Sequence, residues 1–189
     1  MANIDWTILD GFDTDSPIAG EIGALLTRRL EQAGQGHASF KMKEMHLATC
    51  RSCGACNYKS PGKCVVQDDL HEILRAAARS RVLVFLTPIR FGGYTSQLKK
   101  ALEKFMNLGY SYYMMKNGKL LHPMRYGDKS ILSIGVIEAD VPGQEETFQL
   151  HLRRNAQNLL SPHCKAVIVR RDGGGAAQIL PGVEEALAW

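Results

Sequence analysis

The sequence predicts an α/β protein built on a five-stranded parallel β-sheet with helices on both faces. Strand-like and helix-like segments alternate five times in 189 residues, a length that suits one domain over residues 1–189. Residues 82–86 (VLVFL) are wholly apolar, as expected of a strand covered on both faces. Because crossovers between parallel strands are right-handed, we expect a doubly wound sheet with strand order 2-1-3-4-5.

The first strand, helix and second strand follow one another from the N-terminus. Residues 4–9 (IDWTIL) predict a strand. Ser16 followed by Pro17 predicts a helix start, since a hydroxyl cap and a proline at the first helical position favour one. The helix runs to about residue 33, where two nearby glycines end it. Residues 37–45 predict the second strand, because apolar and polar side chains alternate there.

The middle of the chain predicts two helices around the third strand, 82–86. Asp69 and Glu72 stand three residues apart, like a capping box that starts the first helix. After the strand we expect a loop up to Tyr94 and then a helix. Its inward side chains would be Leu98, Leu102, Phe105 and Met106.

The last third predicts a fourth strand at 130–137, a helix at 144–160 and a fifth strand at 164–169. The fifth strand contains Cys164, which we interpret as a core residue. The remaining C-terminal residues are rich in glycine, and we expect at most one helical turn there, without a full-length last helix.

Residues 107–127 interrupt the alternation of strands and helices with a segment rich in tyrosine and methionine. One interpretation is a long connection with some packed aromatic side chains. The other is a flap or a subunit contact, because long insertions are often functional and such side chains form adaptable contact surfaces. The second interpretation predicts a homodimer or homotetramer with 107–127 at the contact.

Composition and charge exclude several classes of partner. The net charge is +4, and the basic residues form scattered pairs without a long basic run, so we expect no nucleic-acid partner. No stretch reaches the roughly 20 apolar residues of a membrane span, and the N-terminus lacks a leader-like pattern. We therefore expect a cytoplasmic protein without membrane contact, whose thiols stay reduced.

A cysteine-rich segment at 47–65 is the strongest chemical signal. Cys50, Cys53, Cys56 and Cys64 follow a C-x2-C-x2-C-x7-C pattern. Structural zinc usually takes two separated pairs, whereas a compact run is typical of iron–sulfur ligation. A turn at 61–62 (Pro-Gly) would bring the fourth thiolate back to the other three. Zinc, or a loop of reduced cysteines packed as small hydrophobic side chains, remain the alternatives.

Ligands of doubly wound sheets bind beyond the carboxyl ends of the strands, where loops 10–17, 88–94 and 135–143 are predicted to lie. The first loop leads into a helix N-terminus, which attracts anions. The second loop contains a proline that fixes its shape and two glycines that permit close backbone approach. The candidate cofactor-binding residues are Gly11, Thr14, Ser16, Pro88, Ile89, Arg90, Phe91, Gly92, Gly93 and Tyr94.

The cysteine run followed by GKCVVQDDL, together with LTPIRFGGYTSQLKKALEKF, resembles the NAD(P)H-dependent FMN reductase and iron–sulfur flavoprotein family, which is flavodoxin-like. The resemblance covers roughly residues 4–140. It implies FMN, with the ring near 88–93 and the phosphate in loop 10–17. It also implies that the four cysteines hold a [4Fe-4S] cluster, which exchanges electrons with the flavin.

Two features depart from the family pattern. Asp10, Asp13 and Asp15 crowd the expected phosphate loop, where carboxylates would repel a group carrying roughly −1.5 to −2 charges. Arg90 stands where the family more often has an aromatic residue, and its guanidinium would stabilise reduced flavin or reach the phosphate.

These observations predict an FMN-dependent oxidoreductase that passes electrons from NAD(P)H, through flavin and the cluster, to an unknown small-molecule or protein acceptor. The cofactor carries the chemistry, so no catalytic side chain is assigned. One alternative is an electron carrier fed by a ferredoxin, without an NAD(P)H site. The other is a flavin-free interaction module whose cysteines hold zinc or no metal. Because the cysteine segment begins just after the second strand, we expect the cluster to lie close to the flavin.

Overall fold

The computed structural model describes residues 4–171 and 173–189, and its centre is a five-stranded parallel sheet. The strand order is β2-β1-β3-β6-β7, and every neighbouring pair is parallel. The bounds are β1 Trp6–Asp10, β2 His37–Lys41, β3 Val82–Pro88, β6 Ser130–Ile137 and β7 Cys164–Arg170. The predicted parallel sheet is confirmed, with its five strands in the expected order along the sheet.

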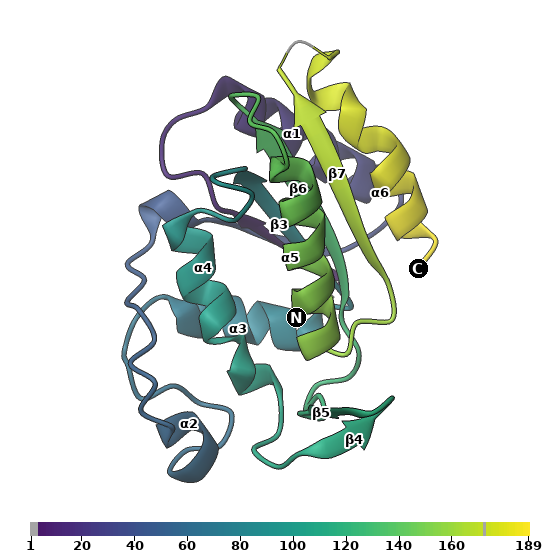
Figure 1. Cartoon of the computed structure of the whole chain (residues 1–189). Helices are drawn as coiled ribbons and strands as arrows, with labels where there is room; N and C mark the ends of the chain where they lie inside the picture. The colour runs from purple at the N-terminus through teal and green to yellow at the C-terminus, as the bar shows by residue number, and fades with distance from the viewer. Residues whose placement is uncertain (1–3, 172) are drawn as a thin grey trace.

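Helices cover both faces of this sheet (Figure 1). Alternate strand residues point to opposite faces, and each face forms its own hydrophobic cluster. One cluster packs against α3 (Leu70–Arg79), α4 (Ser96–Glu103) and α5 (Gln144–Asn158). The other packs against α1 (Pro17–Gln32) and α6 (Leu180–Leu187). The site-forming loops therefore extend from a core that is closed on both sides.

The insertion at 107–127 contains an element that the sequence analysis missed. An antiparallel hairpin joins β4 (Met114–Lys116) to β5 (Lys119–Leu121). Because these two strands come before them in the chain, the fourth and fifth strands of the main sheet are labelled β6 and β7. Its two turn residues, Asn117 and Gly118, have φ angles of 51° and 72°. Two such residues with positive φ form the turn that suits the twist of a hairpin.

The C-terminus forms more regular structure than expected. A short 3-10 helix, η3 (Gly175–Ile179), leads into the two-turn helix α6, which buries Val183 and Ala186. The expectation of at most one helical turn was wrong. Gly182 explains the close packing of α6 on β7, since a Cβ there would lie 2.3 Å from a methyl group of Val167.

Four local expectations also differ from the structure. The helix after loop 88–94 ends at Glu103 and continues as the 3-10 helix η2 (Phe105–Leu108), so Met106 is 42% exposed instead of pointing inward. Cys164 is exposed, because it begins β7 at the edge of the sheet. Asp69 makes no side-chain capping hydrogen bond, since its carboxylate serves the cysteine segment instead. The second strand ends earlier than expected, followed by the 3-10 helix η1 (Met42–Glu44).

Candidate functional site

The loops after β1, β3 and β6 meet at the carboxyl edge of the sheet, as predicted. Arg90, in the loop after β3, bridges the other two: its guanidinium lies 3.6 Å from Asp13 and 3.4 Å from Glu138. Thr95 caps α4 and donates a hydrogen bond from its hydroxyl to the carbonyl of Gly11. These contacts hold three segments together that are far apart in the sequence.

In the predicted phosphate loop, 10–17, two of the three carboxylates form ion pairs and the third accepts a backbone hydrogen bond. Asp15 pairs with Lys43, and this hydrogen bond lowers the pKa of the Asp15 carboxyl. Asp10 is partly buried, which raises the pKa of its carboxyl, and its carboxylate accepts a hydrogen bond from the Phe12 amide. With Arg90 paired to Asp13, and the neighbouring Lys41 paired to Glu44, the cations around this loop already have carboxylate partners. A phosphate at this loop would have to replace a carboxylate at one of them.

The N-terminus of α1 nevertheless has the form that an anion site requires. Ser16 is the residue before the helix and Pro17 is at its first position, as predicted. The Ser16 hydroxyl makes no capping hydrogen bond, so the first amides of α1 have no side-chain acceptor from it. Thr14 is exposed beside them. The donor groups of the loop therefore fit a phosphate, whereas its three carboxylates oppose one.

Loop 88–94 divides the predicted ring-binding residues into two groups. Phe91 is 99% exposed, with a φ of 52°, and it stands free at the carboxyl edge. Ile89 and Tyr94 are buried, and the Tyr94 ring stacks on His151 of α5 with 4.6 Å between centroids. Gly92 packs on α5 so closely that a Cβ would lie 2.5 Å from the Cβ of Thr147. The loop thus offers its backbone and Phe91 to a ligand, while Ile89 and Tyr94 belong to the core.

The four cysteines of the 47–65 segment line a single cavity of about 400 Å³. Its opposite wall comes from Glu103, Met106 and Asn107, at the end of α4 and in η2. Cys56 lies in the short helix α2 (Ala55–Tyr58), which Figure 1 places at the end of the molecule where the strands begin. The cavity is therefore at the amino edge of the sheet, one helix length away from loops 10–17 and 88–94. The expectation that the cysteines lie beside the flavin loops of the same chain was wrong.

A clasp of two aspartates closes the base of the cysteine segment. Asp69 accepts a hydrogen bond of 2.7 Å from the amide of His46, and Asp68 accepts one of 3.0 Å from the amide of Ala48. Lys104 forms an ion pair with Asp68, and the two side chains are only 2% and 0% exposed. The two aspartates that follow the cysteine segment therefore bind the backbone that precedes it. Lys104, at the C-terminal end of α4, pairs with one of them.

The thiols fit a metal centre in type and number. The predicted turn at 61–62 is present, since the Lys63 amide donates to the Ser60 carbonyl and Gly62 has a φ of 78°. Burial, and then the charges of the other three cysteines, raise the pKa of the Cys56 thiol. Among the described residues, no three histidine, cysteine or carboxylate side chains converge in a metal-ligand arrangement. The cavity supplies thiolate ligands whose side chains would have to turn inward.

Sequence reasoning did not find the clasp. Asp68 and Asp69 belong to the QDDL motif, but only Asp69 was considered, as a helix cap. The partner of Asp68, Lys104, is 36 residues away, and a lysine in a helix pattern gives no sign of burial.

No helix of the described chain is long and apolar enough to cross a membrane.

Comparison with known proteins identifies relatives of this chain. A family model described as NADPH-dependent FMN reductase matches residues 15–140. An iron–sulfur flavoprotein of Methanosarcina thermophila is 29% identical over 96 residues, which are 51% of this chain and 49% of that protein. One of Archaeoglobus fulgidus is 26% identical over 88 residues, 44% of this chain and 37% of that one. The chain thus matches about half or less of the length of these relatives.

Solved structures with the same fold cover nearly the whole chain. An NAD(P)H:quinone oxidoreductase from Methanothermobacter marburgensis superposes with a TM-score of 0.69 and 14% identity, over 99% of this chain and 97% of that one. An FMN-dependent NADH-azoreductase from Bacillus anthracis, in complex with FMN, gives 0.68 and 11% over 98% of both chains. At this identity the likeness establishes the fold, which is flavodoxin-like.

Proposed function

The chain belongs to the NADPH-dependent FMN reductase family, and from this premise we propose that it is an FMN-dependent oxidoreductase that takes electrons from NAD(P)H. The observation that carries the proposal is the meeting of loops 10–17 and 88–94 at one edge of the sheet, within the matched region. Ligands of doubly wound sheets bind at this edge.

The residues that would hold FMN come from these two loops. Ser16 and the amides that open α1 would bind the phosphate, and Arg90 would approach it after releasing Asp13. Gly11, Thr14 and the backbone of Pro88, Gly92 and Gly93 would border the cofactor, and Phe91 would cover the ring. When bound, FMN accepts hydride and passes electrons on. The protein contributes binding and orientation, and no side chain is assigned as an acid or base.

We further propose that Cys50, Cys53, Cys56 and Cys64 hold a [4Fe-4S] cluster. Support comes from the shared cavity and from the names of the curated relatives, which are iron–sulfur flavoproteins. Zinc would satisfy the same number of ligands, but zinc has no redox chemistry. Iron and sulfide analysis of oxygen-free protein, compared with Cys56→Ser, separates the two: neither iron nor sulfide in the wild type would overturn the cluster.

The insertion at 107–127 is the proposed contact of a homodimer or homotetramer. Tyr112, Tyr113 and Met115 are each more than half exposed on or beside the hairpin, which is adaptable contact surface. Sedimentation at micromolar concentration tests the contact, and a monomer would contradict it.

We also propose that the protein lies in the cytoplasm, where thiols stay reduced, and that its electron acceptor is a small molecule or a protein.

An absorption spectrum of anaerobically purified protein tests the main proposal. We expect flavin bands that NAD(P)H bleaches, together with broad cluster absorption that changes on reduction. A flavin that only reduced ferredoxin bleaches would favour the electron carrier without an NAD(P)H site. Absence of bound flavin after reconstitution with FMN would favour a flavin-free interaction module, an alternative motivated by the carboxylate pairing of Lys43 and Arg90.

A further inference from the structure

A cavity of about 310 Å³ lies between the β4–β5 hairpin and the C-terminal half of α5, and the first residue of β7 borders it. We call it the hairpin cavity. Figure 1 shows the hairpin at the end of the molecule where β7 begins, away from the proposed flavin loops. The charged residues that line the cavity are Lys116, Lys119 and Arg153. Neither the proposed flavin site nor the cysteine cavity uses any of them.

The pairing of the hairpin turns its two lysines toward α5. Side chains alternate along a strand, so Lys119 and Leu121 share one face, and Lys116 is the cross-strand partner of Lys119. Leu121 is 9% exposed, which identifies this face as the inner one. Met115, 66% exposed, is on the outer face, which belongs to the proposed subunit contact. The hairpin cavity and that contact therefore use opposite faces of the hairpin.

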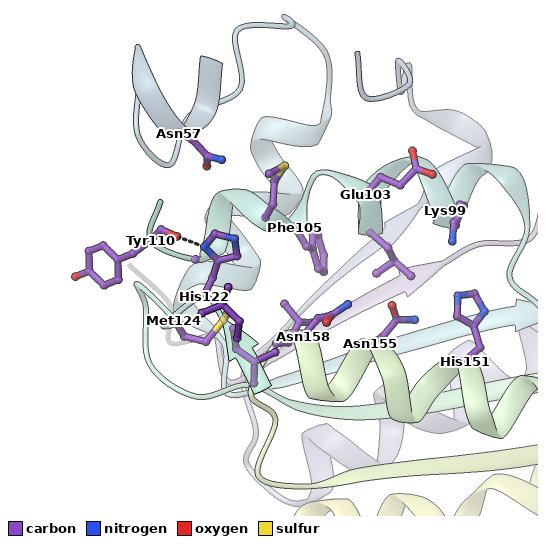
Figure 2. A pocket seen from close by; sticks show the side chains of 16 residues that line it. Asn57, Lys99, Glu103, Phe105, Tyr110, His122, Met124, His151, Asn155 and Asn158 are labelled. Atoms are coloured by element: carbon purple, nitrogen blue, oxygen red, sulfur yellow. Dashed lines mark hydrogen bonds between the residues drawn. The ribbon is translucent and has the colours of Figure 1, made fainter. Parts of the chain in front are cut away.

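Hydrogen bonds hold the hairpin against α5. After β5, the Nδ1 atom of His122 lies 2.8 Å from the Tyr110 carbonyl, which closes the insertion at its base (Figure 2). The Lys119 ammonium donates a hydrogen bond of 2.7 Å to the side-chain oxygen of Gln157 on α5. This partner fixes the ammonium at the cavity wall but is uncharged, so the positive charge remains. A cation that is already in place reduces the entropic cost of binding a ligand.

The three cations of the hairpin cavity have no carboxylate partners. In the sequence, residues 104–127 and 147–171 contain lysines and arginines but no aspartate or glutamate. Within the part of the chain that the structure describes, no carboxylate lines the cavity or lies within 4 Å of the three charged groups. Like charges that share one cavity repel each other, so this arrangement costs stability.

The dipole of α5 does not account for the cation on this helix. A helix C-terminus attracts positive charge, but the effect falls off within the last turn. Arg153 precedes the last turn of α5, which contains no basic residue. A structural role therefore does not explain why these cations face one cavity, whereas an anion in the cavity would offset their repulsion.

We propose that the hairpin cavity binds a diphosphate group, held by Lys116, Lys119 and Arg153. Three unpaired cations match a group with about three negative charges, which a diphosphate carries near neutral pH. Its tetrahedral oxygens meet ammonium groups from several directions, and an arginine fork binds two oxygens at once. The volume is at the lower limit of small-molecule sites, so the cavity takes the diphosphate itself, either free or at the end of a nucleotide.

Cys164 provides a local readout, because it is exposed and lines the hairpin cavity. Uncharged iodoacetamide alkylates its thiol, and peptide mass spectrometry measures the rate at this residue alone. At constant ionic strength, pyrophosphate should slow the alkylation to saturation, and sulfate should need about fivefold higher concentration, as expected for the loss of one exposed ion pair. Undiminished alkylation in millimolar pyrophosphate would overturn the proposal, and equal protection by sulfate would overturn the choice of diphosphate.

ADP separates the two sources of the diphosphate group. Protection of Cys164 at a lower concentration of ADP than of pyrophosphate would assign the cavity to a nucleotide. Equal or weaker protection by ADP would assign it to inorganic diphosphate.

Calorimetric titration of variants with pyrophosphate locates the site. Lys116→Gln and Arg153→Gln should each weaken binding about fivefold. Arg154→Gln is the control, because it removes the same charge from the same helix outside the cavity, and it should bind nearly as tightly as the wild type. Equal losses in Arg153→Gln and Arg154→Gln would indicate attraction to the whole surface and overturn the site. The titration needs neither flavin nor NAD(P)H, so its failure leaves the proposed function untouched.

Discussion

Replacing Asp13 by asparagine should strengthen FMN binding, because Asp13 competes with the phosphate for Arg90. The carboxylate of Asp13 lies 3.6 Å from the guanidinium, and both side chains are roughly half exposed. A phosphate on the opposite side of that guanidinium would lie about 7 Å from Asp13, which is the present 3.6 Å contact plus about 3 Å for the new hydrogen bond. The substitution removes the repulsion between these groups and leaves the shape of the side chain unchanged.

The expected gain follows from Coulomb's law. With a phosphate charge of about −1.75, a separation of about 7 Å and an effective dielectric constant between about 40 and 80, the repulsion is roughly 1 to 2 kcal/mol. This corresponds to roughly 5- to 30-fold in affinity. The gain should shrink as salt is added, since the site is open to solvent.

The assay is quenching of flavin fluorescence at low salt, with FMN and riboflavin titrated in parallel. Riboflavin lacks the phosphate, so its affinity for Asp13→Asn should stay near that of the wild type. Asp128→Asn, at an exposed position just before β6 at the amino edge, makes the same change in net charge and should affect neither flavin. An unchanged ratio of FMN to riboflavin affinity in Asp13→Asn would refute the competition for Arg90.

Three further outcomes are expected. Lys104→Met should destabilise the protein by about 3 to 5 kcal/mol in urea unfolding, because Asp68 is left buried without its cation; the double variant with Asp68→Leu should recover part of the loss, and no recovery would contradict this account. Gly182→Ala should lower stability by about 1 to 3 kcal/mol through its clash with β7, whereas Gly20→Ala, which faces open space, should not; equal effects would be inconsistent with the packing. Because the pKa of His151 is lowered from 6.5, the unfolded chain binds this proton more readily, so stability should fall as the pH drops below 6.5, and it should fall less in His151→Gln; parallel thermal-melting profiles would exclude this cause.

The sheet could be predicted because its signals are local. The apolar run at 82–86 and the Ser16–Pro17 helix start both lie within a few residues, and each marks its element within two residues of its true bounds. The hairpin had a local signal as well, in Asn117–Gly118, but its strands of three residues each are too short for an alternation pattern. The last helix was missed because Gly182, next to a proline, is typical of a helix break, whereas here it permits close packing on β7.

The place of the cysteines could not be predicted, because sequence distance does not fix direction. Ten residues, 45–54, separate η1 from α2. At up to about 3.3 Å each, such a segment can span roughly 30 Å, enough to pass from one edge of the sheet to the other. The grouping of the four thiols in one cavity was predictable from their spacing, whereas Lys104 and its partner meet only in the folded chain.

The aspartate clasp makes the cysteine segment a module with adjacent ends. The amides of His46 and Ala48 are held by Asp69 and Asp68, so the intervening loop begins and ends at nearly the same point in space. The length and the ligands of this loop can therefore change without moving the sheet, because the entropic cost of closing a loop rises only slowly with its length. Loss of a metal would therefore leave the domain folded, in contrast to small zinc domains whose folding depends on the metal. Relatives with shorter, longer or cysteine-free loops at this position would share the same frame.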